Sequence, residues 1–167
     1  MTIYFADGTT IATAPTGGKV VQMVSSTKTG TFTSTTQGSW IDVGLSVTIT
    51  PTSSSNKVYV MAISRMSVNN HASSRVCRGT DTGIGIGDAD GDRSRTSFGE
   101  QYDLGNSYRS MDSPMYYLDS PNTTSATTYK VQARSGQTTY FNRTRYDTNA
   151  SGVARPASTI TVWEIAA

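Results

Sequence analysis

The chain has 167 residues, a size that suits one ordinary domain and leaves little room for a second core. Its 14 basic and 12 acidic residues give a net charge of +2. This balance argues against a nucleic-acid partner, because binding phosphates requires a concentrated basic face.

Small hydroxyl residues dominate the composition, with 27 threonines and 22 serines, while apolar residues make up 35% of the chain. Threonine is β-branched and suits a half-exposed strand, and both residues compete with helical hydrogen bonds. The composition therefore favours strands. The sequence contains no apolar run of about 18 residues and does not begin like a secretory signal. We therefore expect a protein made in a cytoplasm, without membrane insertion.

The first 18 residues predict an N-terminal arm. They hold the apolar stretch Ile3, Tyr4 and Phe5, and they end at the flexible pair Gly17-Gly18. We expect residues 1–18 to form the arm, with Ile3, Tyr4 and Phe5 anchoring the protein or contacting another copy. Residues 19–167 should form one β-sandwich domain.

Short segments with strand character, bounded by turn residues, fill the rest of the chain. In residues 45–50 the alternation is strict, with Leu45, Val47 and Ile49 facing one side. Residues 58–63 are apolar on both faces, as a central strand would be. The predicted strands are residues 20–24, 31–33, 40–43, 45–50, 58–63, 74–78, 84–86, 115–118, 128–133, 139–142 and 159–165.

Two connections have the look of hairpin turns, Gln37-Gly38 and residues 135–137. The number of short strands and the lack of a helical period predict an all-β fold. We expect a single antiparallel β-sandwich, jelly-roll-like, with the short arm in front. The long polar stretch 88–112 should be an outward loop.

Asp88, Asp90 and Asp92 alternate as at the start of a calcium loop. The sixth position of that loop, which requires glycine, is Arg93, and the twelfth is Gly99. We therefore interpret the segment as a solvated, salt-bridged loop, with an irregular metal site as the alternative. No cofactor is expected.

No catalytic residue stands out. Glycines alternate at 83, 85 and 87, which suits a strand packed closely against a neighbour better than a phosphate loop. His71 is the only histidine, and no nucleophile motif accompanies it. Asp103, Asp112 and Asp119 are candidates for a glycosidase pair only if they converge in space. The single cysteine, Cys77, excludes an intramolecular disulfide, and we expect a buried apolar residue.

Tyrosines gather around the polar stretch. Tyr102, Tyr108 and Arg109 are candidate partner-binding residues, because tyrosine and arginine dominate binding hot spots. The alternative is that these residues fill loop packing and that Tyr116 and Tyr117 belong to a core strand.

Several segments resemble small tail fibre or virion structural proteins of marine tailed bacteriophages, of the cyanophage kind. The segments LDSPNTTSATTYKV and ASTITVWEIA are the most specific of them. The matching stretches are residues 2–8, 18–23, 44–51, 83–88, 118–131 and 157–166.

The resemblance implies a homotrimer on the virion surface, attached to other virion proteins through the arm, and it implies no catalytic residues. The leading hypothesis is a non-enzymatic fibre or tip module that binds a host surface glycan or protein. The alternative is a capsid decoration protein that clamps shell subunits. A glycan-degrading tailspike is a third possibility, disfavoured because the chain lacks the repeats of a long β-helix.

Overall fold

The computed structural model describes residues 3–4, 10–11, 18–102 and 109–167, with side chains for 18–99 and 109–167. The described residues form strands and connections without a helix, so they include no helix that could cross a membrane. The all-β prediction is confirmed. The strands are β1 (Ile3–Tyr4), β2 (Thr10–Ile11), β3 (Val20–Lys28), β4 (Phe32–Ser34), β5 (Ile41–Ile49), β6 (Lys57–Val68), β7 (His71–Arg78), β8 (Thr82–Ile84), β9 (Phe98–Tyr102), β10 (Met111–Asp119), β11 (Thr127–Ser135), β12 (Thr139–Phe141) and β13 (Ser158–Ile165).

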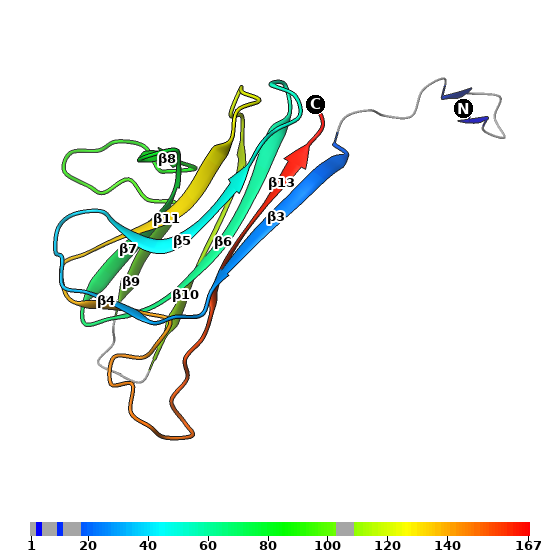
Figure 1. The fold of residues 1–167 in the computed structure, drawn as a ribbon. Coiled ribbons are helices and arrows are strands. Elements are labelled where there is room, and N and C mark those ends of the chain that lie inside the picture. The colour runs from blue at the N-terminus through cyan, green and yellow to red at the C-terminus, as the bar shows by residue number, and fades with distance from the viewer. Residues whose placement is uncertain (1–2, 5–9, 12–17, 103–108) are drawn as a thin grey trace.

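Two antiparallel sheets pack face to face (Figure 1). Sheet 1 has the order β3-β13-β6-β10, and the short strands β12 and β4 extend it beside one end of β6. Sheet 2 has the order β5-β11-β7-β9, with β8 also paired to β7. Successive main strands change sheet except at β7 and β9, which are neighbours in sheet 2; this is the strand order of a jelly roll, so the predicted jelly-roll-like sandwich is confirmed. The β1-β2 pair is a separate two-stranded sheet.

The core lies between the sheets and follows the alternation of the sequence. Leu45, Val47 and Ile49 of β5 are buried, as expected, and the intervening residues are exposed. β6 is a central strand, flanked by β10 on one side and by β13 and β12 on the other. Cys77 is fully buried, as predicted, and burial raises the pKa of its thiol. It lies outside the core cluster, however, and its thiol donates to Gln132 Oε1 at 3.2 Å.

Both predicted hairpins are wrong. β4 pairs with β12 in sheet 1, whereas β5 pairs with β11 in sheet 2, so the connection through Gly38 crosses between sheets. The connection from β11 to β12 through Gly136 crosses in the same way. An alternating strand fits either sheet, and the turn residues alone do not select its partner.

The polar stretch 88–112 is not one loop. Its second half contains β9, which pairs with β7, and the first residues of β10. Phe98 packs against the core and brings this segment onto sheet 2. The core interpretation of Tyr116 and Tyr117 is also wrong, because both side chains are exposed. Tyr117 instead lies against Gly85, where a Cβ would come within 2.7 Å of the ring. The expected close packing is confirmed at Gly83 and Gly85 but not at Gly87, which has open space around it, and the predicted strand 84–86 is wrong, because β8 ends at Ile84 and Gly85 has a φ of +57°.

One carboxylate is fully buried, that of Glu164 near the end of β13. Its Oε1 accepts hydrogen bonds from the Thr52 amide at 2.7 Å and the Thr52 hydroxyl at 2.8 Å. Asn56 donates to the same oxygen at 2.6 Å, and Gln22 donates to Oε2 at 2.6 Å. Burial alone would raise the pKa of Glu164, but these hydrogen bonds outweigh it and lower the pKa to about 2.

Candidate functional site

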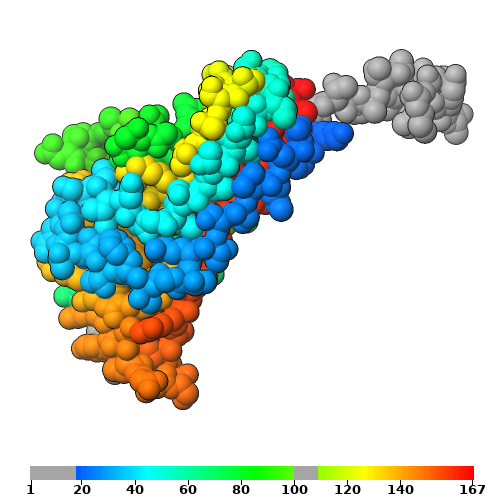
Figure 2. Space-filling view, in the orientation of Figure 1, coloured from blue at the N-terminus to red at the C-terminus, as the bar shows by residue number. Residues whose placement is uncertain are grey.

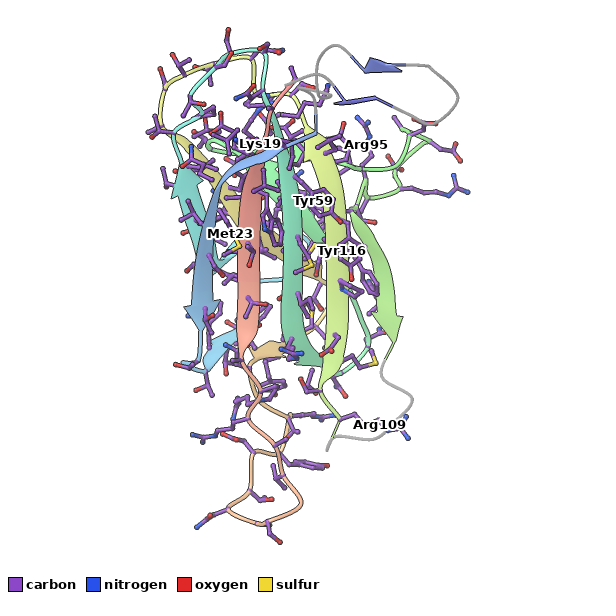
Figure 3. All side chains as sticks on the ribbon, turned by 90° about the vertical axis from the view of Figure 1, so that its right-hand side faces the viewer. Lys19, Met23, Tyr59, Arg95, Arg109 and Tyr116 are labelled. Atoms are coloured by element: carbon purple, nitrogen blue, oxygen red, sulfur yellow. The ribbon has the colours of Figure 1, made fainter. Side chains whose placement is uncertain are left out.

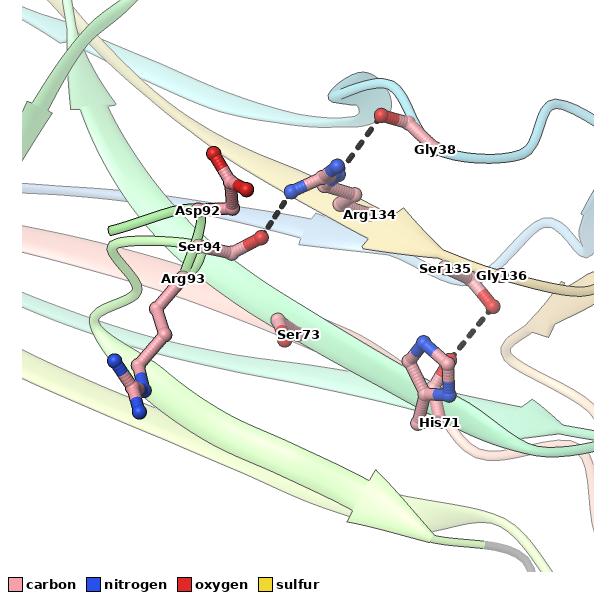
Figure 4. Close-up of a pocket in the computed structure, with 9 residues that line it drawn as sticks. All are labelled: Gly38, His71, Ser73, Asp92, Arg93, Ser94, Arg134, Ser135 and Gly136. Carbon is pink, nitrogen blue, oxygen red and sulfur yellow. Dashed lines mark hydrogen bonds between the residues drawn. The ribbon is translucent and has the colours of Figure 1, made fainter. Parts of the chain in front are cut away.

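The two crossovers between the sheets meet, and a polar groove forms beside them. The amide of Gly38 in the first crossover donates to the carbonyl of Ser135, at the start of the second, at 2.9 Å. The hollow next to this contact has a volume of about 310 Å³ (Figure 4). Its lining residues are Gly38, His71, Ser73, Asp92, Arg93, Ser94, Arg134, Ser135 and Gly136.

A second hollow, of about 380 Å³, continues from the first. The two share Ser73, Arg93 and Ser94, and the second adds Thr96 and Gly99. We call the combined surface the groove. It runs between β7, the end of β11 and the connection from β8 to β9.

Arg134 is held at the centre of the groove from two sides (Figure 4). Its Nε donates to the carbonyl of Gly38 at 2.8 Å, and its Nη1 donates to the hydroxyl of Ser94. In the register of β11 and β7, Arg134 stands directly opposite Ser73. These two contacts engage two of the five N–H groups of a guanidinium, and no hydrogen bond within the described part of the chain engages Nη2.

His71 closes the other end of the groove. A Cβ at Gly136 would lie 3.0 Å from Cε1 and 3.1 Å from Nε2 of the His71 ring, so only glycine admits the ring there. The Ser135 hydroxyl donates to the His71 carbonyl at 2.8 Å. The geometry of this end is therefore set by backbone and small side chains.

The connection from β8 to β9, residues 85–97, forms the outer wall. It stands out from the body of the molecule in green in Figure 2. The amide of Ser97 donates to the Ser74 carbonyl at 3.1 Å, and the Ser97 hydroxyl donates to the Ile84 carbonyl at 2.8 Å. Arg95 donates to the Gly87 carbonyl at 2.6 Å. Hydrogen bonds therefore stabilise the wall internally and attach it to β7.

The lining is polar and mixed in charge. Arg93 forms an exposed ion pair with Asp90 at 2.5 Å, and Asp92 and Arg134 both line the groove. Serine hydroxyls and the imidazole add groups that both donate and accept. A ligand that fits this surface has many hydroxyl groups, because each polar group displaced from water requires a partner.

The alternating aspartates lie in the same wall. The Asp90–Arg93 pair confirms the salt-bridged loop that was expected. Within the described residues, no group of three His, Cys, Asp or Glu side chains could hold a metal ion. Asp88, Asp90 and Asp92 are all exposed.

The predicted binding residues lie at one end of the sandwich as far as they are described. Tyr102 ends β9 opposite His71, but its side chain is outside the described set, and Tyr108 is outside the described residues. Arg109 precedes β10 and is exposed. Their role in binding stays a prediction.

The anchoring residues are described only in part. The backbone of Ile3 and Tyr4 forms β1, paired with β2, while Phe5 lies outside the described residues. Their role in anchoring, and the division at residue 18, stay predictions.

The two suspected carboxylates that the structure describes, Asp112 and Asp119, do not form a catalytic pair with each other. Asp112 and Asp119 are seven residues apart on β10, which places them roughly 23 Å apart, against about 5–9.5 Å in glycosidases. Asp112 pairs with Arg65 at 2.8 Å, and the buried Asp119 pairs with Arg78 at 2.8 Å. Asp103 lies outside the described residues.

Sequence reasoning missed most of the groove. Ser73, Ser94, Arg134, Ser135 and Gly136 come from separate segments, and none belongs to a recognisable motif. Only the sheet pairing brings them together. The one available signal was the pair of glycine-containing connections, which was interpreted as hairpins.

Neither a protein-family model nor a curated protein matches the chain. Among solved structures it is similar to a chain of T=1 particles derived from infectious bursal virus. The TM-score is 0.43, with 13% identity over 87% of this chain and 38% of that chain.

It is also similar to a chain of the infectious bursal disease virus Gx strain. There the TM-score is 0.38, with 11% identity over 88% of this chain and 41% of that chain. The protein spans about two fifths of the length of these structures. Similarity at this level carries no argument about function, and the fold assignment rests on the strand order.

Proposed function

We propose that this chain is a non-enzymatic protein of a virion surface, a fibre or tip module whose groove binds a saccharide of the host surface. Two observations support the virion role. The strand order is that of a jelly roll, a fold that viral capsid and lectin domains use. Six segments of the sequence also resemble virion structural proteins of marine tailed phages.

The groove carries the proposal for saccharide binding. It is lined by hydroxyl groups, a fixed guanidinium and an imidazole, and apolar side chains are missing from the described lining. Such a lining offers donors and acceptors for a polyhydroxylated ligand. A volume of about 310 Å³ lies at the lower end of the range of small-ligand sites, near ~300 Å³. The groove sits on a rigid sheet with loops above it, a common placement for recognition.

The non-enzymatic part of the proposal is supported by the separation of Asp112 and Asp119 and by the ion pair that each one forms. Incubation of the protein with a polysaccharide that it binds should release no reducing ends. Steady release would overturn this part of the proposal.

The direct test is binding to a glycan array that carries neutral and uronic-acid-containing saccharides. The wild-type protein should bind a defined subset. Arg134→Ala should weaken that binding ~10- to 100-fold, because a hydrogen bond from a charged group is worth about 1.5–3 kcal/mol. Arg155→Ala is the matched control, since Arg155 is an exposed arginine that lines neither hollow and should leave binding unchanged. A wild-type protein that binds no saccharide would overturn the proposal.

Capsid decoration is the second candidate function. The apolar stretch Ile3, Tyr4 and Phe5 favours attachment to a larger assembly, which suits a decoration protein as well as a fibre. Deleting residues 1–16 distinguishes the two. Decoration predicts lost binding to purified capsids, whereas the fibre hypothesis predicts lost tail attachment with saccharide binding preserved. The homotrimer implied by the resemblance stays a prediction. It competes with the twofold pairing inferred below, and sedimentation equilibrium of the full chain distinguishes a trimer from a dimer.

A further inference from the structure

The outer face of sheet 1 is uncharged over a wide area. Across β3, β13, β6 and β10 the strand register places Met23, Trp163, Tyr59 and Leu118 in one row. The next two rows are Ser25, Thr161, Met61 and Tyr116, then Thr27, Thr159, Ile63 and Pro114. We call these twelve positions the apolar face. Eight are apolar or aromatic, four carry a hydroxyl group, and none is buried.

The exposure of this face is large. Met23 is 60% exposed, Tyr116 is 55% and Leu118 is 48%. Figure 3 looks onto the face and shows Met23 on β3, Tyr59 on β6 and Tyr116 on β10, with β13 between β3 and β6. Of the eight large hydrophobic side chains exposed in the described chain, six belong to β3 and β10. An exposed apolar patch of this kind marks an interaction surface.

The apolar face can also be dehydrated at little cost. Tyr59 and Trp163 pack together with ring centroids 5.7 Å apart. The Ser25 hydroxyl donates to the Ile160 carbonyl at 3.3 Å, which leaves the Thr161 hydroxyl to donate to Ser25 at 2.9 Å, so covering this pair leaves neither donor unpaired. Charge begins only at the borders, with Lys57 at one end of β6 and the Arg65–Asp112 pair at the other.

We infer that a second copy of this chain covers the apolar face, across a twofold axis. The outer face of sheet 2 cannot match it, because it carries the charged network of Asp42, Lys130 and Arg75. Within the described surface, three exposed large hydrophobics belong to the apolar face, Met23, Tyr116 and Leu118. Val20 and Val21 extend β3 beyond it, Tyr117 packs against Gly85, and Phe32 and Tyr146 lie apart from it, so these side chains form no second patch of comparable extent. The surface of a second copy that suits the apolar face is therefore its own apolar face. Such a contact, in which both copies use the same surface, is isologous.

Charge agrees with this pairing, and the area of the face sets how far the contact extends. A net charge of +2 per copy gives little mutual repulsion. When the twofold axis lies in the plane of the contact and runs perpendicular to the strands, the Lys57 end of one copy lies over the Asp112 end of the other. At ordinary spacings between strands and between residues, a patch four strands wide and three rows long covers a flat area of about 400 Å². This is about half of the ~800 Å² per partner of a stable interface, so the contact has to include the neighbouring exposed residues, such as Val21 on β3.

The test is the oligomeric state of the full chain by sedimentation equilibrium. The wild-type protein should be a dimer at micromolar concentration. Met23→Lys and Tyr116→Lys should each raise the dissociation constant at least 100-fold and yield monomers. Both side chains are more than half exposed in the single chain, so the fold should persist, and circular dichroism melting checks this.

The matched control is Thr48→Lys, an exposed residue on the outer face of sheet 2, which should leave the dimer unchanged. A wild-type monomer, a trimer, or a dimer insensitive to both face variants would overturn the inference. The measurement is independent of saccharide binding, so its outcome does not decide the role of the groove.

Discussion

The buried carboxylate of Glu164 gives a sharp prediction about acid stability. Its pKa falls from 4.5 to about 2 in the folded protein, because the hydrogen bonds from Asn56, Gln22 and Thr52 outweigh the effect of burial. The folded state therefore binds this proton less readily than the unfolded state. The stabilisation is complete above pH 4.5 and disappears as the pH falls toward 2.

The magnitude follows from the shift. A difference of about 2.5 pKa units corresponds to about 3 kcal/mol of unfolding free energy at pH 7, and about 1 kcal/mol remains at pH 3. Glu164→Gln removes the charge, and with its oxygen toward Thr52 and Asn56 it places an NH2 group against the Gln22 donor. The variant should therefore be about 3 kcal/mol less stable than the wild-type protein at pH 7, with the deficit shrinking to about 1 kcal/mol at pH 3.

Urea unfolding of both proteins at several pH values between 7 and 3 measures this difference. Asp42 and Asp147, whose pKa values are also lowered, contribute equally to both proteins and cancel in the comparison. A deficit that is independent of pH, or one below about 1 kcal/mol at pH 7, would refute the hydrogen-bonded carboxylate as its origin.

Two further predictions concern the fold. Gly85→Ala should lower the unfolding free energy by about 2 kcal/mol, because φ is +57° and the new Cβ meets the Tyr117 ring; Gly87→Ala, with open space around it, should change little. Equal thermal melts of these two variants would contradict the argument. Asp119→Asn should cost about 2 kcal/mol in urea unfolding, because it leaves Arg78 without its carboxylate and weakens the bond from the Tyr129 hydroxyl. A loss below about 0.5 kcal/mol would show that the pair contributes little.

The fold class could be predicted because apolar and polar residues alternate within the individual strands. The burial of β5 at Val43, Leu45, Val47 and Ile49 repeats the alternation visible in the sequence. Partner choice could not be predicted, since Gly38 and Gly136 suit a hairpin and a crossover equally well. The buried role of Glu164 was invisible for the same reason, because its donors come from β3 and the connection before β6.

The groove depended on those unpredicted partners. Arg134 lies opposite Ser73 only because β11 pairs with β7, and it meets Ser94 only because the connection from β8 to β9 folds back over sheet 2. The sequence directed attention to the polar stretch that forms the wall. It could not indicate that the groove lies between this wall and β11, which is distant in the sequence.

Saccharide recognition in the groove is tested most directly by amide NMR of the protein titrated with the saccharide that binds best on the glycan array. Shift changes should concentrate at Gly38, His71, Ser94 and Gly136. Changes confined to the neighbourhood of Arg109 or to the apolar face, with these four amides unmoved, would contradict the assignment of the groove.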